Sequence, residues 1–374
     1  MKFVKSWGRL GMKSNWKTCQ LGDLITFQRG HDLPKTKMQG GKYPVVGSNG
    51  IIGYHNEYTT EAPSITIGRS GNVGKPFLFK GRSWSHNTSL YIKEYNAVDP
   101  IFIYYFLQTL DLGNYAGGSA VPTLNRNHIH TLNVYVPTDI DEQRRMGAVL
   151  SVIDDKIELN TAINENLEQQ AQAIYQEMII DNSSDAWNKG KLSDIAVITM
   201  GQSPKGDTYN ENGIGTVFYQ GRAEFSFRFP TRRLFTTEPK RMAEENDVLM
   251  SVRAPVGDLN VATESCCIGR GLAAIHSKDN HQSFVLYTMY AVKKQLNIFN
   301  GEGTVFGSIN KDSLNNIDIT IPDKDTLDKF EGIVAPMDAV IRNNYDENCR
   351  LQSIRDSLLP RLMSGEIDVS EVKI

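Results

Sequence analysis

Two segments of the chain carry their inward-facing residues at alternating steps of four and three, which is the 3.5-residue period of a coiled-coil seam. In the first segment these positions are Met146, Leu150, Ile153, Ile157, Asn160, Asn164, Leu167, Ala171, Ile174 and Met178. In the second they are Phe330, Val334, Met337, Ile341, Asn344, Asn348, Leu351, Arg355, Leu358 and Leu362. The pattern predicts two long helices. Pro336 predicts a kink or a late start of the second helix, and Pro360 predicts a kink near its end.

Asparagines occupy matching seam positions in both segments: Asn160 and Asn164 in the first, Asn344 and Asn348 in the second. A buried polar residue at such a position costs stability but sets the register and orientation of the partner helix. We therefore expect the two helices to pair with each other, antiparallel because long segments separate them. The alternative is two independent amphipathic helices, each packed on its own neighbouring domain.

The segments that precede the helices contain short β-type runs interrupted by Gly, Pro, Asn and Asp. Examples are the runs at 43–46, 64–67, 76–79 and 247–252. Each segment also has one helical run, near 100–109 and near 283–295. We predict two mixed α/β lobes with β-dominated cores.

The chain repeats itself. Trp16 and the following Leu-x-Asp recur at Trp187, 171 residues later, whereas Asn125 recurs at Asn310, 185 residues later. Loops in the second copy are therefore longer. The fold class we expect is α+β, with two similar lobes, two long antiparallel helices and a pseudo-twofold internal repeat. The predicted boundaries are an N-terminal extension 1–15, lobe 1 at 16–137, helix 1 at 138–186, lobe 2 at 187–322, and helix 2 with the tail at 323–374.

Composition excludes several classes of protein. The 374 residues are 40% hydrophobic and 22% charged, as in globular proteins, and we find no apolar run long enough to cross a membrane. The N-terminal stretch is basic but lacks the apolar core of a signal peptide. The four cysteines show neither a CxxC motif nor the density of a disulfide scaffold. We expect a reduced, cytoplasmic protein that contacts no membrane.

The net charge of −3 is unevenly distributed. Residues 1–15 and lobe 1 each carry +4, lobe 2 carries +1, and the helical regions 138–186 and 323–374 carry −8 and −4. Mildly basic lobes joined by acidic helices allow binding to duplex DNA. The basic excess is too small for strong phosphate binding by the chain alone, so a partner would supply part of the electrostatics.

Motifs for catalysis are missing from the sequence. The glycine-rich stretch 68–75 has the wrong spacing for a phosphate loop, and Pro76 stands where a Ser or Thr would hold the metal. His128 and His130 lack further ligands for a metal site. Cys266 and Cys267 lie in an apolar run and read as core residues. We also find no adenine-methyltransferase, Walker or helicase motif, and we predict no cofactor in this chain.

Loop residues suited to base edges and phosphates are the positive candidates, because Arg and Lys can read guanine, and Asn and Gln adenine. In lobe 1 the candidates for DNA binding are Arg29, Lys35, Lys37, Arg69, Ser70, Asn72, Lys75, Asn125 and Arg126. In lobe 2 they are Gln202, Lys205, Arg222, Arg228, Arg232, Arg233, Arg253, Arg270 and Lys311. For any single residue a solvated surface charge is the competing interpretation. The stretches 68–72 and 251–255 are related turns after similar strands, each bearing an arginine.

These features together resemble the specificity subunit of type I restriction-modification systems, over nearly the whole chain. The resemblance rests on the Trp-x4-Leu-x-Asp start of each half, the Asn-[Arg/Lys] and [Val/Ile]-Pro segments that close each lobe, and the helix that follows. The segment 357–366, Ser-Leu-Leu-Pro-Arg-Leu-Met-Ser-Gly-Glu, is the sharpest match. Helix 1 has the family-like Glu142-Gln143 start, whereas helix 2 has Thr326-Leu327 there.

The resemblance implies a non-catalytic subunit with two target recognition domains, each reading one half of a split site in double-stranded DNA. The helices would set the distance between the half-sites and dock two DNA methyltransferase subunits. S-adenosylmethionine would then be carried by these modification subunits, and ATP by restriction/translocase subunits. The alternatives are an orphan specificity subunit or a coiled-coil adaptor that does not touch DNA. A diverged stand-alone DNA methyltransferase or nuclease ranks below them.

Overall fold

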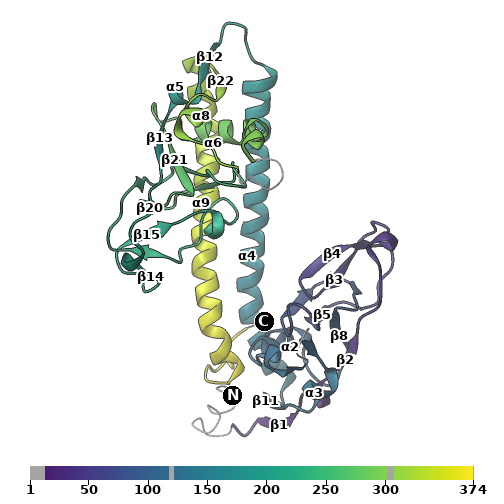
Figure 1. Ribbon diagram of the computed structural model, residues 1–374. Helices are drawn as coiled ribbons and strands as arrows, with labels where there is room; N and C mark the ends of the chain where they lie inside the picture. Colours follow the sequence, from purple (N-terminus) through teal and green to yellow (C-terminus); the bar gives the residue numbers. More distant parts are fainter. Residues whose placement is uncertain (1–12, 118–121, 301–306, 374) are drawn as a thin grey trace. The chain divides into compact units, whose positions relative to one another are not determined.

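The computed structural model describes residues 13–117, 122–300 and 307–373 (Figure 1). Most of the predicted extension 1–15 therefore lies outside the described residues. Contacts divide the chain into two units. Unit 1 comprises 1–160 with 346–374, and unit 2 comprises 161–345.

Unit 1 contains small, mostly antiparallel sheets, ordered β2-β8-β5-β6, β4-β3-β7, β1-β11 and β10-β9. Its strands are β1 Trp16–Gln20, β2 Ile25–Arg29, β3 Tyr43–Gly47, β4 Gly50–His55, β5 Ser64–Gly68, β6 Pro76–Phe79, β7 Trp84–Ser85, β8 Ser89–Tyr95, β9 Ala116–Gly117, β10 Thr123–Leu124 and β11 Asn133–Pro137. Its short helices are α1 Leu21–Leu24, η1 Lys35–Lys37, α2 Pro100–Gln108, η2 Leu112–Tyr115 and α3 Arg126–His130. The strands and the helix predicted for lobe 1 are confirmed.

Unit 2 repeats this architecture with the sheets β13-β21-β18-β19, β14-β16-β15-β20-β17 and β12-β22. Its strands are β12 Asn188–Lys191, β13 Ala196–Met200, β14 Tyr209–Asn210, β15 Thr216–Tyr219, β16 Phe235–Thr236, β17 Met242–Ala243, β18 Val248–Ser251, β19 Leu259–Val261, β20 Cys266–Ile268, β21 Leu272–Ser277 and β22 Asp318–Ile321. Its short helices are α5 Leu192–Ile195, η4 Gly206–Thr208, η5 Arg222–Glu224, α6 Gln282–Ala291, α7 Lys293–Leu296, η6 Asn297–Asn300 and α8 Lys311–Asn315. The repeat predicted from the sequence is confirmed.

Two long helices, α4 (Ile140–Tyr175, continued by a π-helical turn η3, Gln176–Asp181) and α9 (Lys324–Met363), contribute to both units. In unit 1, Asn160 Nδ2 donates to Asn348 Oδ1 at 2.9 Å. In unit 2, Asn344 Nδ2 donates to Asn164 Oδ1 at 2.8 Å. Higher positions on α4 meet lower positions on α9, so the helices are antiparallel in each unit. The predicted pairing through matched asparagines is confirmed.

The late start predicted for the second helix is wrong. Helix α9 begins at Lys324, well before Pro336, and it continues past Pro360 to Met363. Pro336 and Gly332, four residues earlier, are both exposed, so water can bond the carbonyl that the proline leaves without a donor. Phe330 and Val334 are fully buried on the opposite side, and their packing holds the first turns in place.

The repeated Leu-x-Asp motif closes a one-turn helix behind the first strand of each lobe. Leu21 and Leu192 are fully buried. The carboxylates of Asp23 and Asp194 each accept a hydrogen bond from the backbone N–H three residues earlier, at 2.8 Å and 2.7 Å. These bonds cap α1 and α5, so the motif is explained by helix capping and core packing.

The tryptophan that opens each lobe is tied to the start of a long helix. Trp16 Nε1 donates to Glu142 of α4 at 3.0 Å, and Glu142 is buried. Trp187 Nε1 donates to Asp323, just before α9, at 2.9 Å. The second copy therefore replaces the glutamate on the helix with an aspartate that precedes it, although the Glu-Gln pair is missing there.

The C-terminal segment of the chain packs on lobe 1 within unit 1. Gly365 has φ +73°, and a Cβ at this position would lie 2.7 Å from the ring of Trp16. Leu362, Met363 and Val369 are buried in the same core as Trp16. The Ser-Gly-Glu motif therefore ends α9 in a turn that only glycine fits against the tryptophan.

Candidate nucleic-acid interface

In lobe 1, three turns meet where strands β3, β5 and β8 end or begin. The backbone N–H groups of Arg69 and Ser70 donate to Thr88 O at 2.8 Å and 3.2 Å. Leu124 N donates to Arg69 O at 2.8 Å, and Ser48 N donates to the hydroxyl of Thr88 at 3.3 Å. We call this group of turns, 48–49, 69–72 and 86–88, the lobe 1 turn cluster. Its backbone is held rigidly, so its side chains start from defined positions.

Lobe 2 has the same arrangement. Val252 N donates to Gly271 O at 2.9 Å, and Ile309 N donates to Val252 O at 3.0 Å. The turns 220–222, 252–255 and 269–271 therefore form the lobe 2 turn cluster. By these bonds Val252 takes the place of Arg69, and Arg253 takes the place of Ser70. The turns are related as predicted, but the two arginines differ in position by one residue and point differently.

The equivalence also locates most of the longer loops of the second copy. Equivalent residues are 173 apart at Val46 and Tyr219, which pair with β7 and β20, but 183 apart at Gly68 and Ser251. Lobe 2 thus has ten more residues between β15 and β18 than lobe 1 has between β3 and β5. Part of this insertion is the connection 220–234, which contains four of the predicted DNA-binding arginines.

The predicted site residues of lobe 1 lie on its surface. Arg29, Lys35, Lys37, Asn72, Lys75, Asn125 and Arg126 are exposed, while Arg69 and Ser70 are half-buried. Arg69 donates to Asn87 O at 3.3 Å. The side chain of Asn125 caps α3 by accepting from Asn127 N at 3.0 Å, which explains why an asparagine recurs before α8. Of the residues resolved in 13–117 and 122–300, none of the six cations in this set forms an ion pair within lobe 1.

In lobe 2 several predicted residues are paired with carboxylates. Arg222 contacts Asp258, Arg232 Nε lies 2.5 Å from Glu264, and Arg233 lies 2.5 Å from Glu224 and 3.1 Å from Glu211. The remaining polar candidates of this lobe are exposed, namely Gln202, Lys205, Arg253, Arg270 and Lys311. The structure brings Arg222, Arg253 and Arg270 together in the lobe 2 turn cluster.

Arg228 is the exception among the predicted residues, because its side chain is only 2% exposed. It contacts Asp338 of α9, and its NH1 lies 3.4 Å from Glu168 of α4. A buried, doubly paired guanidinium offers no donors to DNA, so we leave Arg228 out of the candidate interface.

Sequence reasoning missed His31. Its backbone N–H donates to Ser85 O at 2.8 Å, as Gln202 N donates to Ile268 O at 2.9 Å, so His31 is the counterpart of Gln202. Both side chains are exposed beside their turn clusters. The constant offset between Gly30 and Gly201 was the signal that identifies this pair.

The part of the chain that is described holds no group of three or more His, Cys, Asp or Glu side chains suited to a metal ion. Cys266 and Cys267 are fully buried, and burial raises the pKa of Cys266 to about 12. That thiol stays protonated near neutral pH and is no nucleophile. None of the described helices is both long and apolar enough to span a bilayer.

Comparison with known proteins places these lobes in context. The sequence model of the family described as "Type I restriction modification DNA specificity domain" matches residues 13–169 and 184–352. A protein of Methanocaldococcus jannaschii, named as the type I restriction enzyme MjaX specificity subunit, is 28% identical over 81% of this chain and 77% of its own length. The HindI specificity subunit of Haemophilus influenzae is 21% identical over 73% of this chain and 78% of its own.

A solved structure shares the fold. The type I restriction-modification S subunit from M. genitalium superimposes with a TM-score of 0.68 and 17% identity, over 94% of this chain and 98% of its own. The predicted architecture of two similar lobes with two long helices is thereby confirmed.

Proposed function

The chain belongs to the family of type I restriction-modification DNA specificity domains, and we propose that lobes 16–137 and 187–322 are two target recognition domains that each read one half of a bipartite site in double-stranded DNA. The observation that carries this proposal is the pair of turn clusters, which share a backbone frame and differ in side chains. A common scaffold with two different polar surfaces is what recognition of two unlike half-sites requires.

The side chains of the clusters suit base edges. Arg253 and Arg270 project from rigid turns and can bond guanine through two donors, and Gln202 can bond adenine. Arg222, held by Asp258, is oriented before any contact with DNA, which limits the entropy lost on binding. The exposed cations of lobe 1, such as Lys35 and Lys37, suit phosphates.

The two long helices serve in this proposal as the spacer between half-sites. The asparagine contacts in both units fix the register of α4 against α9, and a fixed register gives a fixed length. Because half-sites must lie at a defined helical phase, spacer length becomes part of the recognised sequence.

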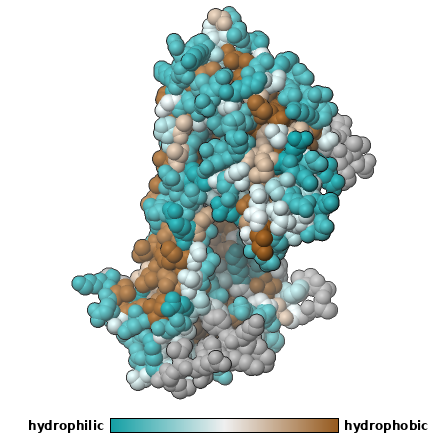
Figure 2. All heavy atoms as spheres, turned by 90° about the vertical axis from the view of Figure 1, so that its left-hand side faces the viewer, coloured by the Kyte–Doolittle hydropathy of each residue, from teal (hydrophilic) through white to brown (hydrophobic). Residues whose placement is uncertain are grey.

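We propose that the chain is non-catalytic and works in a complex with two DNA methyltransferase subunits, joined by restriction/translocase subunits. Hydrophobic residues at exposed positions of α4 support docking of a partner: Val152 is 67% and Leu159 56% exposed, one heptad apart. The face in Figure 2 is mostly hydrophilic and bears several separate hydrophobic patches. S-adenosylmethionine and ATP belong to the partner subunits in this scheme.

The proposal is tested by expressing the chain with the methyltransferase encoded beside it and mapping adenine methylation in the host DNA. We expect a bipartite methylated motif that disappears when this chain is omitted. Co-purification without any change in methylation would favour an adaptor. Unchanged methylation without co-purification would favour an orphan subunit.

Substitution of Arg253 by alanine is expected to relax one position of one half-site. Loss of a guanidinium that bonds a base costs about 1–3 kcal/mol of discrimination at that base pair. The measurement is methylation of a library in which each position of the site is varied. Lys191→Ala, which removes an exposed, ion-paired cation from β12, is the matched control and should leave the motif unchanged. A relaxed preference at every position would instead indicate a phosphate contact.

A further inference from the structure

The added connection of lobe 2 sends one arginine away from the turn cluster and into the two long helices. Arg228 has φ +60°, a backbone conformation that non-glycine residues rarely adopt, and its side chain is buried. Its guanidinium contacts Asp338 of α9 and lies 3.4 Å from Glu168 of α4. One side chain of the lobe therefore contacts both helices within unit 2.

Both carboxylates are further bonded by the lobe. Asp338 accepts from Ser283 Oγ at 2.7 Å and from the Tyr287 hydroxyl at 3.0 Å. Glu168 accepts from the Tyr290 hydroxyl at 2.9 Å. Burial by itself would lower the pKa of Arg228, but Asp338 and the tyrosines raise it above its ordinary value. The network is charge-balanced and directional, which makes removal of one member costly.

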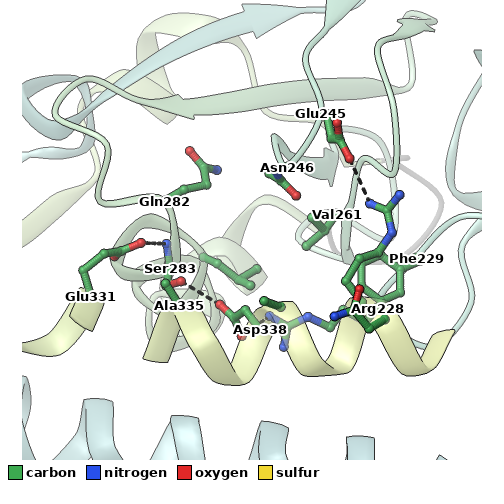
Figure 3. A pocket seen from close by; sticks show the side chains of 14 residues that line it. Arg228, Phe229, Glu245, Asn246, Val261, Gln282, Ser283, Glu331, Ala335 and Asp338 are labelled. Atoms are coloured by element: carbon green, nitrogen blue, oxygen red, sulfur yellow. Dashed lines mark hydrogen bonds and ion pairs between the residues drawn. The ribbon is translucent and has the colours of Figure 1, made fainter. Parts of the chain in front are cut away.

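The contact between lobe 2 and α9 around this network is polar and incompletely packed. A cavity of about 420 Å³ lies there, lined by Arg228, Ser283, Glu331, Asp338 and their neighbours (Figure 3). Glu331 accepts from Ser283 N at 3.0 Å, and Arg342 NH2 donates to Thr263 O at 2.6 Å. Close packing does not fix the lobe here, so its orientation depends on these few directional bonds.

Unit 1 uses the equivalent aspartate differently. Asp154 is the counterpart of Asp338 in the helix repeat, 184 residues earlier. It bonds the Tyr105 hydroxyl at 2.7 Å and Arg355 of α9 at 2.8 Å. There the arginine comes from the other helix, because the connection between β3 and β4 is a tight turn without an arginine. The lobe-to-helix arginine is thus specific to lobe 2.

We propose that Arg228 is a positioning residue that holds recognition lobe 2 on the spacer helices and thereby restricts which half-site spacings are accepted. This inference rests on the proposed function. One added base pair moves a half-site by about 3.4 Å along the axis and turns it by about 35°. A lobe held by directional bonds to two helices cannot follow that displacement, whereas a lobe freed from them can turn toward it.

The test is methylation by the assembled complex on DNA with fixed half-sites and spacers of varied length. Arg228→Met keeps the length of the side chain and removes its donors. We expect methylation at spacers one base pair too long or too short to rise about tenfold relative to the correct spacer, equivalent to about 1.4 kcal/mol. The half-site sequences should stay unchanged. Arg144→Met removes an exposed, ion-paired arginine from α4 and should leave the spacing preference as it is.

The outcomes separate the inference from its premise. A folded Arg228→Met complex with the spacing preference of the wild type overturns the role of Arg228, even if its melting temperature is lower. A wild-type complex that methylates no bipartite motif contradicts the proposed function instead. If Arg228→Met does not assemble, Arg228→Lys decides, because an ammonium keeps the charge but loses the planar fork that reaches both helices. Relaxed spacing in that variant supports the inference, and an unchanged preference overturns it.

Discussion

Inserting seven residues into each long helix is expected to lengthen the accepted spacer by about three base pairs. Seven helical residues add about 10 Å, and each base pair of DNA spans about 3.4 Å. The insertion belongs next to the contact of Asn160 with Asn348, at the same level in α4 and α9, so that the asparagine pairs remain matched. Mapping the methylated motif before and after the insertion measures the change.

The half-site sequences serve as the internal control, because the lobes are untouched and should read the same bases. An insertion into α4 alone is the second control. It moves Asn160 out of register with Asn348, so we expect a lower melting temperature and poor methylation at every spacing. A doubly lengthened protein that methylates only at the original spacing would refute the role of the helices as a spacer.

Phe330→Ala is expected to cause the largest loss of stability, about 3–5 kcal/mol, because it empties a fully packed aromatic site. The ring of Phe330 lies 5.7 Å from Tyr175, 6.3 Å from Phe284 and 6.2 Å from Tyr287. These contacts join α9, the end of α4 and α6 in unit 2. The alanine leaves a cavity that the three surrounding rings cannot fill.

Urea unfolding followed by tyrosine fluorescence and circular dichroism measures this loss. Lys329→Ala, at the exposed neighbouring position, should change the free energy of unfolding by less than about 0.5 kcal/mol. A loss of under about 1 kcal/mol for Phe330→Ala would mean that the aromatic cluster contributes little to the stability of unit 2.

The local pattern predicted the helices because their seam repeats over many turns. Asn160, Asn164, Asn344 and Asn348 pair as expected, since polar residues at seam positions have few other partners inside a helix pair. The late start at Pro336 was wrong because a proline rule weighs one missing hydrogen bond. Burial of Phe330 and Val334 on the other face outweighs it.

The candidate site was predicted less completely. The turn clusters were located from the repeat, yet the shift between Arg69 and Arg253 follows from backbone bonds that no sequence pattern displays. Arg228 resembled the other loop arginines in the sequence. Its burial depends on a left-handed backbone and on acids 60 and 110 residues away, which only the folded chain brings near.

The sequence by itself determined the repeat, the two helices with their antiparallel pairing, the β-rich lobes and the lack of catalytic motifs. Those features follow from periodicity and spacing, which are local properties of a chain. Only the tertiary structure decided which polar side chains cap helices, which arginines are held by carboxylates and which one anchors lobe 2. These roles depend on contacts between residues distant in sequence, because a side chain's role is set by the groups that surround it after folding.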